Sequence, residues 1–406
     1  MQVQRRLILH VQGYDPHGVA DNHQRFHREY QRTCALYGLT GEVGAPAESR
    51  DGVSASWEVS TKGDGWQVDT RYTLLRFDDL VRKDMERAPW WKIVQMYRTI
   101  GVAILNGAFG RMLRANWRFA LVAFAPILLI TVWVLFGSFV GILCMNLVTV
   151  LGAPEFVART VGFVTGFGGF ASLLWLTEPL TGLLLRCDEA ASIDQFVTGK
   201  RPDWSQRLDA FAGDVTDAVQ DGKADEIVIV GHGLGAVLAI NVLGRALTRD
   251  GALGSHGPRV ALLTLGASLP AVGFNPEAKG FRNRLRQLAT MPDIDWIDVQ
   301  SRDDMLSFTP FDPIAGHDIA LDTPRRNPQV MTVRFSDLWA GGSLLRRLRV
   351  SKLHAQYLMA NERRGSPYDY TVICCGPLDL ATRTASPQRA EAALAGKFEP
   401  DSAPMR

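Results

Sequence analysis

The clearest indication of a binding or catalytic site in this sequence is a glycine-rich turn between an apolar run and a helical stretch. Residues 227–230 have the sequence Ile-Val-Ile-Val, which is typical of a buried strand. Gly231, Gly233 and Gly235 alternate in the turn that follows, and residues 236–243 have helical character. Backbone N–H groups at the start of such a helix can bind a phosphate, a carboxylate or an oxyanion. The residue types at the turn therefore decide what it could do.

Dinucleotide binding is one chemistry that uses a strand, a glycine turn and a helix. Gly231, Gly233 and Ala236 fit the spacing G-x-G-x-x-[GA], in which a pyrophosphate lies at the start of the helix. The same site needs an acidic residue at the end of the next strand. That predicted strand runs into residues 265–268, Leu-Gly-Ala-Ser, and Asp250 follows the helix instead. We therefore expect no cofactor, and dinucleotide binding remains an alternative.

The turn also resembles the nucleophile elbow of the α/β-hydrolases. Residues 231–235, Gly-His-Gly-Leu-Gly, are similar to the G-H-S-L-G form of G-x-S-x-G that is frequent in lipases and esterases. Small flanking residues in that motif allow a sharp bend that lifts a serine above the sheet. Gly233 stands where the serine would be, so covalent acyl transfer lacks its nucleophile.

The α/β-hydrolase resemblance implies an acid and then a histidine further along the chain. A predicted strand at residues 295–300 is followed by a polar turn, in which we expect Asp304 to be the acid, with Asp303 as the alternative. His354 precedes a helix-like run at residues 355–358, where the hydrolase histidine usually lies. An aspartate here could simply cap a turn, and one histidine among eight is more often structural. The order along the chain favours the triad positions.

The resemblance further implies an oxyanion hole made of two backbone N–H groups. One would belong to Leu234, the residue after the centre of the elbow. The other would come from the turn after an early strand. Gly13 and Tyr14, which follow the apolar run at residues 7–11, are the expected source, because a glycine lets the backbone come close.

Strand-like and helical segments alternate on both sides of the middle of the chain. We expect strands at residues 7–11, 53–59, 68–77, 226–230, 259–265 and 296–300, and helical segments at residues 21–36, 77–101, 204–220 and 236–248. This alternation predicts an α/β fold, and the resemblance makes it an α/β-hydrolase-like, mostly parallel sheet flanked by helices. Residues 382–406 lack a sustained apolar period, which predicts a mobile tail.

The middle of the chain is uncharged over lengths that a bilayer requires. Residues 119–154 and 160–177 contain no Asp, Glu, Lys or Arg, and a spanning helix needs about 20 apolar residues. Two core helices of a soluble protein are the alternative, but helices apolar all round would need burial on every side. The predicted division is an N-terminal part of the hydrolase-like domain (1–114), an inserted two-helix transmembrane hairpin (115–186), a C-terminal part of that domain (187–381) and the tail (382–406).

Charge and cysteine content bound the environment and the partners. Basic residues flank the hairpin, whereas its turn offers only Arg159, so both soluble parts are expected in the cytoplasm. With 44 basic and 42 acidic residues, the net charge of +2 gives no single-sign field for nucleic acid. The five cysteines are odd in number and lack a CxxC pair, which argues against a disulfide framework and a zinc ribbon. The expected partners are the lipid bilayer and an acyl ester or lipid.

These features predict a membrane-anchored, lipase-like or esterase-like protein of the α/β-hydrolase fold. Active relatives would hydrolyse carboxylic esters, and this chain would be inactive or impaired because of Gly233. The alternative is a non-catalytic pseudo-hydrolase that binds an acyl ligand or a protein partner. A third hypothesis, that the serine was replaced to disable an esterase, makes the same prediction for this sequence.

Overall fold

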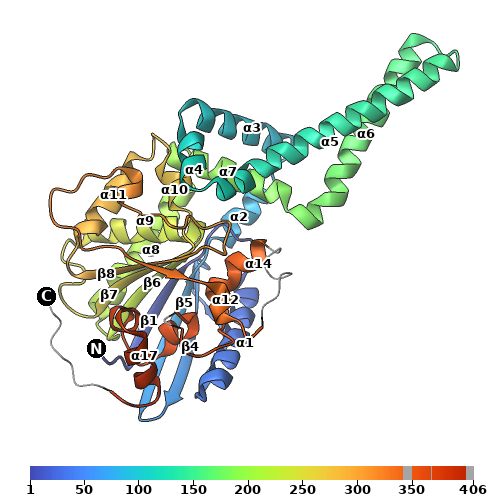
Figure 1. Cartoon of the computed structure of the whole chain (residues 1–406). Coiled ribbons are helices and arrows are strands. Elements are labelled where there is room, and N and C mark those ends of the chain that lie inside the picture. Colours follow the sequence, from blue (N-terminus) through green and yellow to red (C-terminus); the bar gives the residue numbers. More distant parts are fainter. Residues whose placement is uncertain (342–349, 367, 399–406) are drawn as a thin grey trace.

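The computed structural model consists of an α/β body from which one long pair of helices projects (Figure 1). It describes residues 1–341, 350–366 and 368–398. The projecting pair is inserted after the first strands of the body, and the chain then returns to complete the same sheet. The body is therefore built from segments on both sides of the insertion.

The sheet is mixed and mostly parallel, with the strand order β2-β4-β5-β1-β6-β7-β8-β9 and β3 beside β4. Its strands are β1 (Arg5–Val11), β2 (Thr40–Val43), β3 (Ala47–Glu48), β4 (Ser54–Gly63), β5 (Trp66–Leu75), β6 (Glu226–His232), β7 (Arg259–Leu265), β8 (Ile294–Ser301) and β9 (Gln329–Val333). From β5 to β9 all neighbours run parallel, whereas β4 is antiparallel to β2, β3 and β5. The predicted α/β class with a mostly parallel sheet is confirmed. Strands β2, β3 and β9 were not predicted from the sequence.

Helices cover both faces of the sheet, because its central strands are apolar on both sides. On β6, Ile227 and Ile229 pack in the core under α8 and α9, whereas Val228 and Val230 pack in the core under α1 and α15. The helices are α1 (Val19–Tyr37), α2 (Asp78–Met85), α3 (Pro89–Leu105), α4 (Ala108–Ala115), α5 (Trp117–Val150), α6 (Glu155–Thr181), α7 (Leu183–Val197), α8 (Pro202–Asp221), α9 (Leu234–Arg249), α10 (Leu269–Gly273), α11 (Lys279–Thr290), α12 (Phe335–Leu338), α14 (Val350–His354), α15 (Tyr370–Cys375), α16 (Leu380–Ala385) and α17 (Pro387–Leu394), with short 3₁₀ turns η1 (Ala315–His317) and η2 (Ala355–Leu358).

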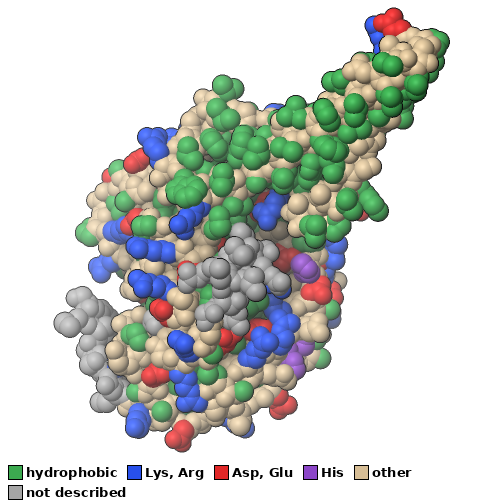
Figure 2. All heavy atoms as spheres, turned by 45° about the vertical axis from the view of Figure 1, so that its right-hand side comes forward, with side chains coloured by type: hydrophobic (Ala, Val, Ile, Leu, Met, Phe, Trp, Pro, Cys, Tyr) green, Lys and Arg blue, Asp and Glu red, His purple; other side chains and the backbone are tan. Residues whose placement is uncertain are grey.

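The projecting pair is formed by α5 and α6, which contact each other through glycines. A Cβ on Gly137 would lie 2.6 Å from the carbonyl oxygen of Gly166, and one on Gly141 would lie 2.5 Å from that of Gly162. Missing side chains therefore let the two backbones come close. Both helices are long and apolar enough to cross a membrane, judged by length and composition. Hydrophobic side chains cover the visible face of the pair and continue onto the neighbouring part of the body (Figure 2).

The end of the chain differs from the prediction of a mobile tail. From Thr382 to residue 398 the chain continues as α16 and α17, whose Ala390 and Ala393 are buried. The indole N–H of Trp66 donates to the carbonyl oxygen of Leu394 over 3.2 Å, which ties α17 to β5. Capping by Asp379 and Ser386 starts both helices. Residues 399–406 lie outside the described residues.

A buried ion pair joins the two central strands to the C-terminal segment. Arg6 on β1 donates Nε–H to Glu226 on β6 over 2.7 Å, and both side chains are almost fully buried. The guanidinium also donates to the carbonyl oxygens of Gly376 and Leu378, while Glu226 accepts the N–H of Leu380. Arg6 therefore holds together segments from both ends of the sequence.

We predict that Glu226→Gln lowers the free energy of unfolding by about 3–5 kcal/mol, because the buried Arg6 guanidinium loses its counter-charge. Urea denaturation of the detergent-solubilised full chain measures the loss. The matched control is Glu58→Gln, which breaks the exposed pair with Arg71 and should cost less than about 1 kcal/mol. Equal losses in the two variants would contradict the assignment.

A buried histidine on β1 makes the fold sensitive to acid. His10 Nδ1 lies 2.6 Å from the hydroxyl of Tyr72. Burial, together with the positive charge of Arg25, lowers the pKa of His10 to about 3, whereas in an unfolded chain a histidine has a pKa of about 6.5. Between these values the unfolded chain binds the extra proton. This residue's contribution to stability is therefore complete above pH 6.5 and is lost as the pH falls towards 3.

We predict that His10→Asn reduces the loss of stability between pH 7 and pH 5 by about 2 kcal/mol, since each pH unit below 6.5 costs about 1.4 kcal/mol per such histidine. Urea titrations at the two pH values give the difference. His256→Asn, at an exposed position, is the control and should leave the difference unchanged. An identical pH dependence in His10→Asn and in the unsubstituted chain would refute the prediction.

Candidate functional site

The turn between β6 and α9 is sharp, and its glycines are required by close backbone contacts. Gly233, the N-cap of α9, has φ 58° and ψ −119°, a conformation that residues with side chains rarely adopt. A Cβ on Gly231 would lie 2.4 Å from the carbonyl oxygen of Gly235. A Cβ on Gly235 would lie 2.6 Å from that of Val11. The alternating glycines therefore let α9 start directly at the end of β6, beside the end of β1.

The loop after β1 lies against this turn. A Cβ on Gly13 would be 3.0 Å from the backbone nitrogen of Gly235, so the loop and the start of α9 are in backbone contact. Leu234 is the first residue of α9, where N–H groups have no partner within the helix. The structure thus brings together Gly13, Tyr14 and Leu234, the three residues predicted for an oxyanion hole.

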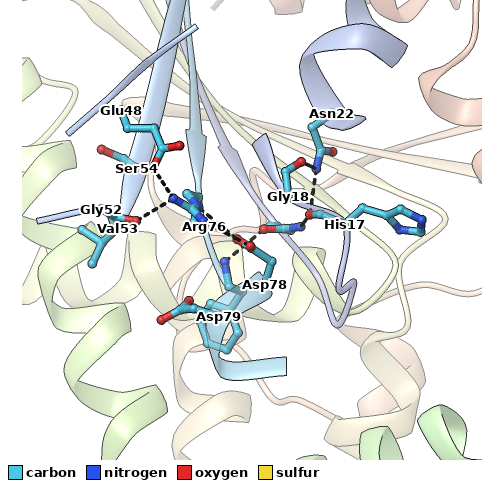
Figure 3. Close-up of polar contacts among 12 residues, drawn as sticks. His17, Gly18, Asn22, Glu48, Gly52, Val53, Ser54, Arg76, Asp78 and Asp79 are labelled. Atoms are coloured by element: carbon cyan, nitrogen blue, oxygen red, sulfur yellow. Dashed lines mark hydrogen bonds and ion pairs between the residues drawn. The ribbon is translucent and has the colours of Figure 1, made fainter. Parts of the chain in front are cut away.

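The same loop is held at several points. Gln12 is buried: its amide donates to the carbonyl oxygens of Asp15 and His17, and its side-chain oxygen accepts the N–H of Phe77. Figure 3 shows the end of the loop, where Asn22 donates to the carbonyl oxygens of His17 and Gly18.

Nearby, the start of α2 is fixed by charge. Arg76 donates to both carboxylate oxygens of Asp78 and pairs with Glu48 over 2.6 Å (Figure 3). The loop and the neighbouring helix start are therefore rigidly positioned.

The tyrosine of this loop points away from the turn. Tyr14 donates its hydroxyl to Asp84 on α2 over 3.0 Å, and Asp84 also accepts from Arg201 and Ser192, each over 2.8 Å. Burial and the charge of Asp84 raise the pKa of Tyr14 above its ordinary range. Only the backbone of Tyr14 is thus available to the turn, and its side chain anchors the loop to the helices that precede and follow the projecting pair.

The predicted acid and histidine meet in space. Asp304, in the loop after β8, has an Oδ2 2.8 Å from Nδ1 of His354, and its Oδ1 accepts the N–H of Leu306. Asp303 turns the other way and accepts the N–H of Phe335, at the start of α12. The preference for Asp304 over Asp303 as the partner of His354 therefore agrees with the geometry.

The other imidazole nitrogen of His354 faces residue 233. A Cβ on Gly233 would lie 2.7 Å from Nε2 of His354, closer than real Cβ contacts. Asp304 and Gly233 thus lie at different nitrogens of the His354 ring, and a Cβ at position 233 would require the ring to shift. A group at this point would be within reach of a base whose Nδ1 is held by a buried carboxylate.

His232, which precedes the glycine, contacts His354 through a hydrogen bond and its ring, a role that was not predicted from the sequence. Its Nε2 donates to the backbone carbonyl oxygen of His354 over 2.8 Å, and the two rings lie 4.2 Å apart. Burial and the neighbouring His354 lower the pKa of His232 well below its ordinary value. His232 is therefore a neutral donor that fixes the position of His354.

A carboxylate on α7 was also missed, because only the tertiary structure brings α7 to this edge. Burial raises the pKa of Glu189, and the charges of Arg186 and His354 oppose that shift.

The loop that carries Asp304 is attached to the base of the projecting pair. Asn116, the N-cap of α5, donates to the carbonyl oxygen of Ser307 over 2.7 Å. The rings of Phe119 and Phe308 lie 4.3 Å apart, and Arg111 on α4 donates to the carbonyl oxygen of Phe274 over 2.6 Å. The site and the projecting helices therefore share one end of the body, at the carboxyl ends of the parallel strands.

A dinucleotide-binding site and a metal site find less support among the described residues. Asp250 is the C-cap of α9, at the opposite end of a helix of 16 residues from Gly233, so a distance of about 24 Å separates it from the glycine turn. Among the described residues, no group of three or more His, Cys, Asp or Glu side chains could hold a metal ion. An open hollow of about 540 Å³, lined by Arg5, Asp225 and Pro258 among others, lies at the amino ends of the strands, away from Gly233.

We predict that Gly233→Ala destabilises the fold by about 1–3 kcal/mol, because the backbone at position 233 is strained for alanine and His354 must move from the new Cβ. Gly101→Ala, on α3 with nothing near its Cβ position, should instead be neutral or stabilising by up to about 1 kcal/mol. Urea denaturation measures both variants. An unchanged stability in Gly233→Ala would show that the turn relaxes at no cost.

Comparisons of this chain with models of protein families, with curated proteins and with solved structures found no match.

Proposed function

We propose that this protein is a membrane-anchored member of the α/β-hydrolase fold, whose scaffold is that of a lipase-like or esterase-like hydrolase of carboxylic esters. The observation that carries the proposal is the line from Asp304 through His354 to Gly233 at a strand–turn–helix elbow. The chain order of the elbow, the acid and the histidine supports it. So does the place of all three at the carboxyl ends of parallel strands, where open α/β sheets bind ligands.

Each residue has a defined role in this proposal. In a form with serine at position 233, the serine oxygen attacks the ester carbonyl, and Nε2 of His354 takes the proton. Asp304 orients the imidazole and stabilises its charged form. The N–H of Leu234 and one N–H of the Gly13-Tyr14 loop donate to the oxyanion. The present chain has no oxygen at position 233, so it forms no acyl-enzyme, and its activity is absent or reduced to slow attack by water.

A second candidate is a pseudo-hydrolase that binds an acyl ligand or a protein partner without turnover. One observation favours it: a Cβ at position 233 would lie 2.7 Å from Nε2 of His354, so the present position of the ring suits a glycine. Asp304 is buried and hydrogen-bonded. Its pairing with His354 therefore also stabilises the fold, because a buried carboxylate needs hydrogen-bond partners even where no catalysis takes place.

The membrane anchor of this proposal is the pair α5 and α6, crossing the bilayer as a hairpin with both soluble parts on the cytoplasmic side. The length and composition of the two helices support a crossing, and the basic residues beside their bases support the sidedness. Because the loop of Asp304 is attached to the start of α5, the anchor would hold the site next to lipid.

The central test compares Gly233→Ser with Gly233→Ala. Both variants carry the same backbone strain and the same contact with His354, but only serine supplies a nucleophile. We predict that Gly233→Ser gains ester hydrolysis by a factor on the order of 10³ or more, since loss of a triad serine costs up to about 10⁶-fold. Rates are measured on p-nitrophenyl esters of short and long acyl chains, and labelling by a fluorophosphonate reports the serine directly.

Two controls make this test specific. Gly233→Ala should show no gain and no label, and adding His354→Ala to Gly233→Ser should remove most of the gain. A folded Gly233→Ser protein with neither hydrolysis nor label would contradict the ester-hydrolase scaffold and favour the second candidate. Labelling of the unsubstituted chain would reveal a different nucleophile and would also contradict the mechanism.

A further inference from the structure

The helices before the projecting pair form a basic and apolar surface that the proposed anchor alone does not explain. We call residues 87–118 the collar; they comprise α3, α4 and the start of α5. The collar contains six basic residues and no acidic residue. Figure 2 shows hydrophobic side chains running from the projecting pair onto the adjoining body.

One face of α3 is exposed and apolar. Trp90, Val94, Tyr97, Ile104 and Leu105 follow one another at helical spacing, and between 41% and 89% of each is exposed. The opposite face of α3 packs in a core with α5 and α7, through the buried Met96 and Ile100. A helix with one buried face and one exposed apolar face needs a second apolar surface to cover it.

The position of α3 along α5 sets its depth relative to a bilayer. A hydrocarbon core about 30 Å thick takes about 20 residues of helix, and counting back from Val150 at the far end of α5 puts its other boundary near Ile130. Ile130 belongs to the core that holds Met96 and Ile100, and the hydroxyl of Tyr97 lies 2.8 Å from that of Thr131. The exposed face of α3 therefore lies beside the boundary between the hydrocarbon and the headgroups, where tryptophan and tyrosine are enriched.

The charges of the collar divide into two sets. Arg87, Lys92 and Arg98 pair with carboxylates of α2 and α7 inside the body. Arg111 and Arg114 donate to backbone carbonyls, and Arg118 lies over the ring of Trp117. In the described part of the chain, none of these last three arginines has a carboxylate partner. Arg114 and Arg118 are exposed and are free to meet negative charge.

We infer that the collar is a second membrane contact, which lies in the plane of the bilayer surface and binds anionic phospholipid headgroups of the leaflet on the side of the body. Its apolar stripe enters the boundary between headgroups and acyl chains, and Arg114 and Arg118, which lie on the side of the body, are attracted by the negative potential of the anionic surface. The inference rests on the proposed anchoring by α5 and α6 and adds the lipid class and the orientation. With the collar on the surface, the attached Asp304 loop is held against the headgroup layer.

The experiment uses the full chain in nanodiscs of phosphatidylcholine, with or without phosphatidylglycerol. Cys34→Ser and Cys144→Ser remove the two half-buried thiols, and single cysteines carry an environment-sensitive fluorophore. Val94→Cys reports the apolar stripe, Phe139→Cys reports the middle of α5, and Lys223→Cys reports an exposed point of the body. Lipids with a nitroxide quencher near the headgroup or near the chain end give the depth of each fluorophore.

We expect the fluorophore at position 94 to be quenched most by the shallow nitroxide, the one at 139 by the deep nitroxide, and the one at 223 by neither. Quenching at position 94 should be stronger with phosphatidylglycerol present.

The double variant Arg114→Gln/Arg118→Gln should weaken the binding of the collar to the lipid surface. The ratio of lipid-bound to unbound collar, read from the quenching at position 94, should fall by roughly 25-fold, since each arginine near an anionic surface contributes about fivefold in affinity. Arg5→Gln/Arg71→Gln, at exposed arginines remote from the collar, is the matched control and should change nothing.

The outcomes separate the collar from the anchor. No quenching at position 94 by either lipid, with deep quenching retained at 139, overturns the collar and leaves the anchor standing. A shielded but unquenched fluorophore at 94 points to a protein covering the stripe and also overturns the inference. No quenching at 139 contradicts the anchoring in the proposed function itself. Quenching at 94 that is independent of both phosphatidylglycerol and the two arginines contradicts the choice of anionic lipid.

Discussion

The close backbone contact between the start of α9 and the loop after β1 is the constraint on which the rest of the site depends. A Cβ on Gly235 would lie 2.6 Å from the carbonyl oxygen of Val11, and a Cβ on Gly13 would lie in tight contact with the backbone nitrogen of Gly235. Gly231 allows the chain to reverse immediately after β6. A side chain at any of these positions would push the helix away from the sheet. The contact fixes the start of α9 so that Gly233, its N-cap, faces the imidazole of His354.

The loops around this point are fixed to the helices that carry the projecting pair, by polar contacts on one side and apolar contacts on the other. Tyr14 joins the network of Asp84, Ser192 and Arg201, while Phe308 packs on Phe119 at the start of α5. Such buried networks resist local opening because breaking them exposes unpaired polar groups. These contacts therefore fix the projecting pair relative to the loops of the site, and this holds for any chemistry that the site performs.

The Asp304–His354 pair beside a glycine has a structural explanation that does not need catalysis. A buried carboxylate must keep its hydrogen bonds, and His354 supplies one of them while the backbone of Leu306 supplies another. His232 in turn fixes the backbone of His354. Gly233 adds no strain beside this network, because a glycine adopts a positive φ readily.

The sequence by itself determined the features that depend on local pattern. The glycine turn, the main strands and helices and the two long apolar helices follow from local pattern, and the structure agrees with their positions. Spacing and chain order left Asp303 as an alternative to Asp304, and the structure places Asp304 beside His354. Only the tertiary structure decided what depends on distant contacts. The edge strands β2 and β3 are short, polar and paired antiparallel with β4, and α17 is ordered by its contact with Trp66. Likewise, Arg6 and Glu226 are 220 residues apart. Local periodicity carries no information about such pairs, since their energy arises from burial that the folded chain alone creates.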